Sequence, residues 1–195
     1  MSTSLQKVII LAAPSGAGKT TITQYLLKRF PRLAFSISAT TRAPRGAEQD
    51  GVEYHFLSLP KFEGLIYDNA FLEYEQVYEG VYYGTLKSEL ARIWALGKVP
   101  VLDIDVKGAL RVQEQLGEKS ISIFIMPPSI ETLKDRLLNR QTETEESIKT
   151  RIDKAEYEIS FSNQFNAIVK NEILETACTE AANLLMDFLG PDFTK

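Results

Sequence analysis

The sequence has a single cysteine, Cys178, among its 195 residues. One cysteine excludes an internal disulfide and any metal site built from several thiolates. No apolar stretch reaches about 18 residues, the length that a membrane-spanning helix needs. The first residues, MSTSLQKVII, also lack the apolar run of a secretory signal. We therefore expect a protein of the reducing cytoplasm that has no membrane partner.

Excess positive charge is missing as well. The chain has 22 Lys and Arg against 26 Asp and Glu, a formal net charge of −4. This balance provides no general surface for nucleic acid, so we expect no nucleic-acid partner. An anionic small-molecule substrate would need arginines concentrated at one place. The sequence leaves the oligomeric state open.

Apolar runs typical of buried strands alternate with helical patterns along the chain. Strands are predicted at Val8–Ala12, Val101–Ile104, Ile121–Met126 and Ala167–Val169. Helices are predicted at Leu86–Leu96 with Thr85 as N-cap, Val106–Leu116, Ser129–Arg140, Glu145–Phe161 and Glu172–Leu189. This alternation predicts an α/β fold in three layers, a parallel sheet with helices on both faces.

Two segments differ from that alternation. Residues 36 to 84 are rich in Thr, Tyr, Gly and Arg and contain short alternating pieces, which predicts a small, mostly β insertion. Residues 129 to about 160 hold two charged helical patterns around RQTETEES. Two excursions from one core predict two moving lids.

The segment APSGAGKTT, residues 13 to 21, follows the first predicted strand. Gly16 and Gly18 allow a tight backbone turn, Lys19 supplies a positive charge, and Thr20 offers a hydroxyl for Mg²⁺. Ala13 departs from the strict GxxxxGK[ST] pattern, and we expect it to have a negative φ. The alternative is a glycine-rich turn with a chance GKT. The flanking strand and helical pattern favour a phosphate-binding loop.

Arginines gather at two places outside this loop. SATTRAPRG, residues 38 to 46, sets Arg42 and Arg45 among hydroxyl side chains, a pattern suited to a second phosphate group. RLLNRQTETEESIKTR contains Arg136, Arg140 and Arg151. These are either solvated surface cations or groups that close over transferring phosphates.

Carboxylates mark two further segments. FLEYEQVYEGVYYGT holds Glu73, Glu75 and Glu79 among tyrosines, and VLDIDVKG ends an apolar strand in Asp103 and Asp105. Carboxylates in that position face the ligand crevice of an open α/β sheet. DVKG also fits the DxxG pattern of GTPases, but the NKxD element that reads guanine in those proteins is absent.

Together these motifs resemble the guanylate kinase family, ATP-dependent kinases of GMP, over nearly the whole chain. The similar segments are PSGAGKT, the S.TTR.PR.GE..G..Y.F pattern from Ser38, F.E from Phe71, YYGT, LDID and TEESI..R. Within the second pattern Gly46 and Ala47 are exchanged relative to the usual order of the family. The GMP-side segment between Glu73 and Tyr83 is one residue longer than the common form of the family.

The resemblance implies a P-loop fold with a GMP-binding insertion at about 36–96, a helical lid at about 129–161, and a core at about 1–35, 97–128 and 162–195, all within one domain. It implies ATP and GMP, and dGMP as well, as substrates. Mg²⁺ would accompany ATP and bind Thr20. ATP would contact Ala13, Pro14, Ser15, Gly16, Ala17, Gly18, Lys19 and Thr20. GMP would contact Ser38, Arg42, Arg45, Tyr54, Glu73, Tyr83, Thr85 and Asp105, with Glu73 and Thr85 at the guanine edge. Lys19, Arg136, Arg140 and Arg151 would be catalytic.

Two other functions fit parts of the pattern. A guanylate-kinase-like scaffold would keep the fold without turnover, but it would have no use for Lys19, Thr20 and the lid arginines together. A kinase of another phosphorylated acceptor, such as a ribose phosphate, would not need Glu73 with Thr85.

Overall fold

The computed structural model describes residues 6–138 and 145–194. The chain divides into two compact units, one formed by Met1–Val8 with Arg32–Leu102 and the other by Ile9–Pro31 with Asp103–Lys195. We call them unit 1 and unit 2. No helix in the described residues is both long enough and apolar enough to span a membrane.

A five-stranded sheet confirms the predicted α/β class. Its strand order is β2-β7-β1-β8-β9, and β2 pairs in parallel with β7, as β8 does with β9. The strands are β1 (Val8–Ala12), β2 (Leu33–Phe35), β7 (Val99–Asp103), β8 (Ser120–Met126) and β9 (Ala167–Lys170). Every residue of β1 is fully buried, as its unbroken apolar run predicts. The three-residue β2 is too short to produce a sequence pattern and was not predicted.

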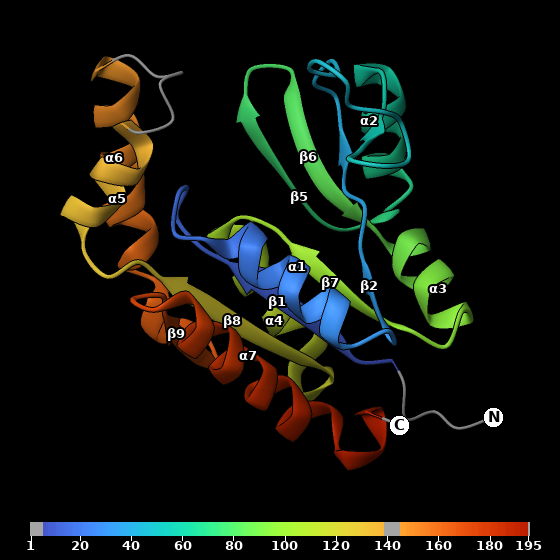
Figure 1. The fold of residues 1–195 in the computed structure, drawn as a ribbon. Coiled ribbons are helices and arrows are strands. Elements are labelled where there is room, and N and C mark those ends of the chain that lie inside the picture. Colours follow the sequence, from blue (N-terminus) through green and yellow to red (C-terminus); the bar gives the residue numbers. More distant parts are fainter. Residues whose placement is uncertain (1–5, 139–144, 195) are drawn as a thin grey trace. The chain divides into compact units, whose positions relative to one another are not determined.

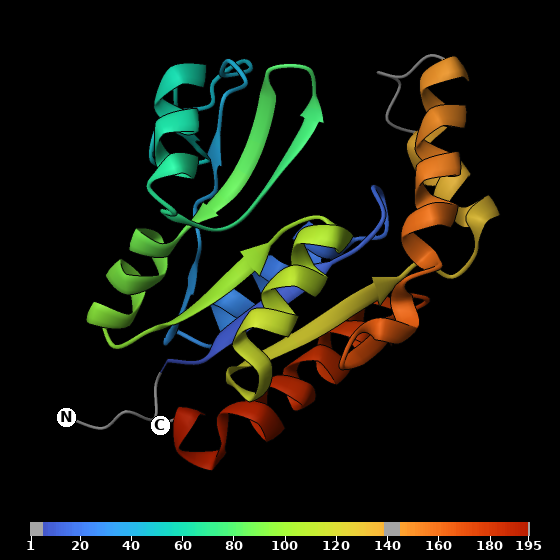
Figure 2. The ribbon, with the colours of Figure 1, turned by 180° about the vertical axis from the view of Figure 1, so that it is seen from behind.

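Helices cover both faces of the sheet in unit 2. The helices α1 (Lys19–Arg29) and α7 (Leu174–Leu189) lie on one face and α4 (Val106–Leu116) on the other (Figure 1, Figure 2). The lid segment forms α5 (Ile130–Leu138) and α6 (Glu145–Ile159), which pack through Leu133, Ile152 and Ala155. Short 3-10 turns lie at Gly117–Lys119, Ser162–Gln164 and Pro191–Thr194.

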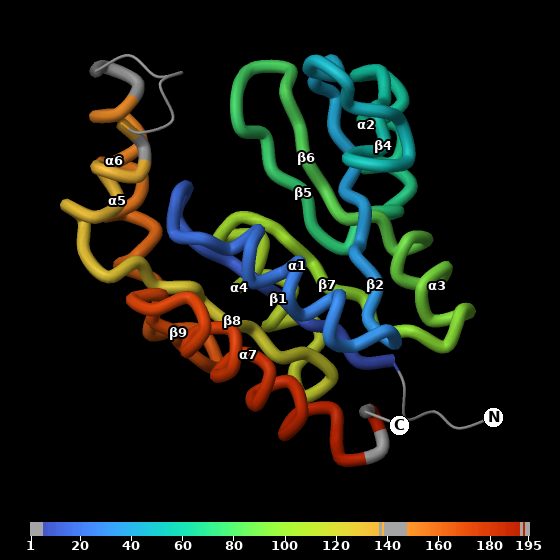
Figure 3. Tube along the Cα trace, viewed as in Figure 1, coloured from blue at the N-terminus to red at the C-terminus, as the bar shows by residue number. Residues whose placement is uncertain are grey.

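Unit 1 contains the predicted β insertion as a second sheet of order β4-β3-β6-β5. The chain passes from β2 into this sheet and returns through α3 to β7 (Figure 3). Its elements are β3 (Ala39–Thr40), β4 (His55–Phe56), α2 (Leu59–Tyr67), β5 (Phe71–Tyr78), β6 (Val81–Leu86) and α3 (Lys87–Ala95). Helix α2 was not predicted, and its buried Phe62 stacks on Phe71 with ring centroids 4.3 Å apart.

The β5–β6 hairpin fixes the register of the proposed guanine edge. Glu73 lies opposite Thr85, and register shifts occur between Phe71 and Glu73 and again between Gln76 and Tyr78. A bulge adds a residue to one strand without moving the pairing beyond it. The second shift therefore accommodates a residue near the hairpin end while Glu73 and Thr85 stay opposed.

Two sequence predictions need correction or lie outside the structure. Thr85 is not the N-cap of α3, because the cap residue is Leu86 and Thr85 belongs to β6. The hydroxyl of Thr85 bonds across the hairpin instead of to the helix. Arg140 lies outside the described residues.

Candidate active site

The glycine-rich loop connects β1 to α1 in unit 2 (Figure 1). Gly16 and Gly18 have φ values of 90° and 95°, and the Ala17 N–H donates to the Pro14 carbonyl over 3.1 Å. Among the described residues only Asn69 is a non-glycine with positive φ, so Ala13 has the predicted negative φ. The loop thus turns at its two glycines, as expected, and leads directly into the first turn of α1.

Lys19 is held by groups at the end of β7. Its ammonium forms an ion pair with Asp103 and donates to the Ile104 carbonyl at 3.3 Å. Asp103 was singled out in the sequence only as a carboxylate facing the crevice. In this structure it neutralises the lysine that would otherwise face donor phosphates.

Asn171 holds the glycine-rich loop through a hydrogen bond to its backbone. Its side-chain amide donates to the Ala17 carbonyl at 2.7 Å, and its own N–H donates to the Met126 carbonyl at 2.8 Å. A Cβ on Gly18 would lie 2.2 Å from the Asn171 amide nitrogen, so a side chain there would displace this contact. Sequence reasoning missed Asn171, although it directly follows β9, at the carboxyl end of a sheet strand where ligand sites gather.

Two of the predicted arginines reach the same loop. Arg136 on α5 donates to the Gly16 carbonyl at 3.4 Å and to the Asn171 carbonyl at 3.5 Å. Arg151 on α6 donates to the Ser15 hydroxyl at 2.9 Å. Unit 2 therefore brings together the glycine-rich loop, Lys19 and two of the arginines that the sequence predicts for a lid.

Glu158, on the last turns of α6, is a buried carboxyl beside this cluster. It is 9% exposed, and its Oε1 lies 3.7 Å from the Lys154 ammonium. Burial raises the pKa of the Glu158 carboxyl above its ordinary 4.5; Lys154 and Lys19 oppose this shift and Asp105 adds to it. Burial prevails because a charge in a low-dielectric setting loses its hydration.

We expect Glu158 to make the protein less stable as the pH rises above 4.5, the ordinary pKa of the group. In that window the folded chain holds a proton that the unfolded chain releases. Glu158→Gln does not titrate, so its melting temperature should gain on that of the wild type as the pH rises toward neutrality. Thermal unfolding of both proteins, with the exposed Glu156→Gln as control, measures this gain. A pH-independent difference in melting temperature would contradict it.

Arg42 is the most highly connected of the residues in unit 1 that the sequence predicts to bind phosphate. Its guanidinium donates to both carboxylate oxygens of Glu48 at 2.8 and 3.1 Å and to the Tyr83 hydroxyl at 3.0 Å. It also lies over the rings of Tyr54 and Phe56, 5.2 and 5.7 Å from their centroids. The bonds to Glu48 raise the pKa of Arg42 despite its burial, and those from Arg42 lower the pKa of Glu48. A phosphate that binds Arg42 must therefore compete with Glu48.

Glu73 and Thr85 form a buried polar pair on the hairpin. They are 6% and 1% exposed, and the Thr85 hydroxyl donates to Glu73 Oε1 at 2.7 Å. Gly84, next to Thr85, is required by close packing, since a Cβ there would lie 2.9 Å from the Glu73 carbonyl. The pair fixes the position of Oε1 of the Glu73 carboxylate.

The remaining predicted residues divide between the units. Ser38 is half-buried in unit 1, and its carbonyl accepts from the His55 N–H at 2.9 Å. Arg45 is exposed, and its backbone N–H donates to Glu48 at 2.7 Å. Asp105 belongs to unit 2, where it caps α4 by accepting from the Gly108 N–H at 3.0 Å.

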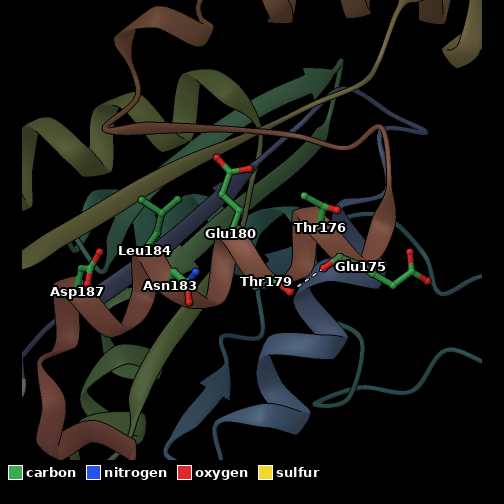
Figure 4. A pocket seen from close by; sticks show the side chains of 7 residues that line it. All are labelled: Glu175, Thr176, Thr179, Glu180, Asn183, Leu184 and Asp187. Carbon is green, nitrogen blue, oxygen red and sulfur yellow. Dashed lines mark hydrogen bonds between the residues drawn. The ribbon is translucent and has the colours of Figure 1, made fainter.

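A hollow along the outer face of α7 holds none of the predicted site residues (Figure 4). It is lined by Glu175, Thr176, Thr179, Glu180, Asn183, Leu184 and Asp187. All seven belong to one helix and point outward from it, so the hollow is the polar outer face of α7.

Comparison with known proteins agrees with this geometry. The model of the guanylate kinase family matches residues 5–188 of this chain. The chain is 50% identical to a guanylate kinase of Bacteroides fragilis over 186 residues, which cover 95% of this chain and 91% of the relative. It is 47% identical to a guanylate kinase of Porphyromonas gingivalis over 187 residues, or 95% of this chain and all of the relative.

A solved structure is similar over the same extent. The crystal structure of guanylate kinase from Anaplasma phagocytophilum has a TM-score of 0.75 and 28% sequence identity, covering 98% of this chain and 90% of that one. Sequence and structure thus agree over both units, and the chain belongs to the guanylate kinase family of phosphotransferases.

Proposed function

We propose that this chain transfers the γ-phosphoryl group of ATP to the phosphate of GMP, and of dGMP, and releases ADP and GDP or dGDP. The observation that carries the proposal is the buried Glu73–Thr85 pair, a carboxylate suited to guanine, in a chain that also has a phosphate loop. Family membership supports the same reaction. We further propose that residues of about 36–96 bind GMP, that about 129–161 form a lid, and that both serve one domain.

The donor half uses unit 2. The backbone N–H groups of the loop at residues 13 to 20, which Pro14 lacks, bind the β- and γ-phosphates together with the start of α1, because a helix N-terminus favours anions. Lys19 leaves Asp103 for the phosphate oxygens. Arg136 and Arg151 now donate to the Gly16 carbonyl and the Ser15 hydroxyl, and they turn to the transferring phosphoryl group when ATP is present.

The residues also fit Mg²⁺. Thr20 is exposed in the first turn of α1, and its hydroxyl with phosphate oxygens makes the hard oxygen set that Mg²⁺ prefers. When bound, the ion neutralises charge on the phosphates.

The acceptor half uses unit 1. Arg42, Arg45, Ser38, Tyr54 and Tyr83 hold the GMP phosphate, and Arg42 exchanges Glu48 for it. Glu73 accepts from the guanine N1–H and N2 amino groups. Thr85 orients Glu73 in the unbound state and would need to turn its hydroxyl away to donate to O6. Asp105, which belongs to unit 2, is proposed as a GMP ligand from the family resemblance alone.

The chemistry needs no strong base, because the attacking oxygen of GMP is already anionic. Catalysis then rests on positioning and on stabilising charge during transfer. Closure of the lid excludes water, which would otherwise accept the phosphoryl group. A coupled assay of ADP release with ATP and each of the four nucleoside monophosphates tests the proposal. Release of ADP with GMP, but with none of the other three nucleoside monophosphates, supports the proposal. No release above background with any acceptor would favour the scaffold alternative.

For Arg140→Ala we expect a fall in kcat on the order of 10²-fold, with little change in KM, because a lid arginine strengthens its contact as charge redistributes. Lys134→Ala, an exposed cation on α5, is the matched control. Steady-state kinetics with both substrates varied provide the measurement. An unchanged kcat would make Arg140 a solvated surface cation.

The cytoplasmic location and the absence of nucleic-acid and membrane partners stay predictions from the sequence. The oligomeric state stays open.

A further inference from the structure

Glu89 on α3 is a buried carboxylate in unit 1 that the proposed chemistry does not use. It is 4% exposed. Its Oε1 accepts from the Ile37 N–H at 3.1 Å and from Arg92 Nη2 at 2.7 Å, and its Oε2 accepts from Arg92 Nε at 2.9 Å. His55 Nε2 lies 3.8 Å from Oε2. Buried charges of this kind persist only when their partners are specific.

The contacts of Glu89 adjoin two proposed phosphate ligands. Ile37 directly precedes Ser38, and His55 directly follows Tyr54. The two segments are themselves joined, because the His55 N–H donates to the Ser38 carbonyl at 2.9 Å. From α3, one carboxylate therefore contacts both segments next to these proposed ligands: the connector at Ile37 and strand β4 at His55.

Residues 36 to 38 connect β2, in the five-stranded sheet, to β3, in the second sheet. In this connector the Ser36 N–H donates to the Val101 carbonyl at 3.0 Å and the Ser38 carbonyl accepts from the His55 N–H, whereas the Ile37 N–H between them donates to a side chain. The Ile37 N–H has an ionised partner, which makes a stronger bond than a neutral acceptor. Burial alone would raise the pKa of Glu89, but Arg92 and the Ile37 N–H outweigh it and hold that pKa below its ordinary value. Glu89 is thus ionised at neutral pH.

We propose that Glu89 is a positioning residue for binding of the GMP phosphate. By accepting from the Ile37 N–H, Glu89 fixes the backbone at Ile37 and thereby the position of the Ser38 hydroxyl. The inference rests on the proposed function, because it takes Ser38 as a phosphate ligand. Arg92 has a different role. Its side chain is 52% exposed, and its guanidinium neutralises the charge of the buried Glu89 carboxylate.

The contacts of Glu89 with Ile37 and with Arg92 allow a matched test, because substitution can remove them separately. Glu89→Ala removes the acceptor for Ile37, and we expect KM for GMP to rise about tenfold while KM for ATP stays within about twofold. Glu89→Gln keeps one oxygen for Ile37 and should raise KM for GMP by only about threefold. Arg92→Gln breaks the pair on α3 but leaves the carboxylate bound to Ile37, so KM for GMP should change by less than about twofold.

Hydrogen exchange and circular dichroism complete the experiment. The Ile37 amide should exchange faster in Glu89→Ala than in Arg92→Gln, in proteins that are both folded. If Glu89→Ala does not fold, Glu89→Leu takes its place, because leucine fills the buried position and also lacks an acceptor for Ile37. An equal rise in KM for GMP in Arg92→Gln would overturn the inference, since it would reduce Glu89 to a stabiliser of α3. In Glu89→Ala, a rise in KM for ATP as large as the rise in KM for GMP would also overturn the inference.

Failure of the proposed function is separable from failure of this inference. Wild-type turnover of GMP, together with a raised KM for GMP in Ser38→Ala, would support the proposed function by itself. A normal KM for GMP in folded Glu89→Ala under those conditions would refute the positioning role alone. No turnover of GMP by the wild type would refute the proposed function, and the inference with it.

Discussion

Lys19→Ala is expected to lower kcat by at least about 10³-fold while GMP still binds. The reason is that we propose Lys19 as a ligand of the donor phosphates only. It lies in unit 2 beside Asp103 and the Ile104 carbonyl, whereas Arg42, Glu73 and Thr85 lie in unit 1. Loss of the ammonium also leaves the Asp103 carboxylate without this partner close to incoming phosphates, which adds repulsion to the missing attraction.

The measurement combines kinetics with calorimetry. Lys28→Ala, an exposed lysine in the last turn of α1, is the control for a change of charge on the same helix. Turnover should fall in Lys19→Ala alone, and titration calorimetry should give the same affinity for GMP in both variants. Loss of GMP binding together with catalysis would refute the assignment of Lys19 to the donor.

Glu73→Gln is expected to remove most of the preference for GMP over AMP. An ionised carboxylate accepts from the guanine N1–H and N2 amino groups together, whereas adenine presents an acceptor at N1. Unpaired polar groups in a closed site can amount to a discrimination on the order of 10⁴. The amide of glutamine accepts only one of the two guanine bonds, so GMP should lose roughly 1–3 kcal/mol.

The buried contact with Thr85 sharpens this expectation. In the unbound chain Thr85 donates to Glu73 Oε1 at 2.7 Å, so a glutamine that keeps this bond directs its NH₂ group away from Thr85. The same NH₂ group could donate to adenine N1. The substitution therefore weakens the binding of GMP and, at the same time, removes a penalty against the binding of AMP.

The ratio of kcat/KM for GMP to that for AMP is the quantity to measure, with circular dichroism to verify the fold. Glu75→Gln, two residues along β5, is the matched control. An unaltered ratio in a folded Glu73→Gln would sink the guanine-reading role. Attention would then move to Glu75 or Asp105.

Much of the core could be predicted because its signals are local. The run Val8–Ala12 and the pattern Val106–Leu116 coincide with β1 and α4. Gly97 and Gly117, both with positive φ, follow the ends of α3 and α4, close to where the sequence predicted that these helices end. Each of these features depends on residues within one turn or one strand, so spacing alone contains the information.

The errors arose where a short segment depends on its neighbours. The sequence LPKFEGLIY contains Pro60 and Gly64, and within a β-like region it gives no clear helical pattern, yet it forms α2 against Phe71. Thr85 has the side chain of an N-cap, but its hydroxyl bonds to Glu73 across the hairpin. Tertiary pairing overrode local preference in both cases.

The sequence by itself determined the phosphate loop, the α/β alternation and the residue types that a GMP kinase needs, because these follow from spacing and chemistry along the chain. Only the tertiary structure decided the partners of those residues. Lys19 pairs with Asp103, Asn171 holds Ala17, and Glu89 holds Ile37, over separations of 52 to 154 residues for the two hydrogen bonds. No sequence pattern encodes such pairs, because folding brings distant residues together according to the geometry of whole sheets and helices.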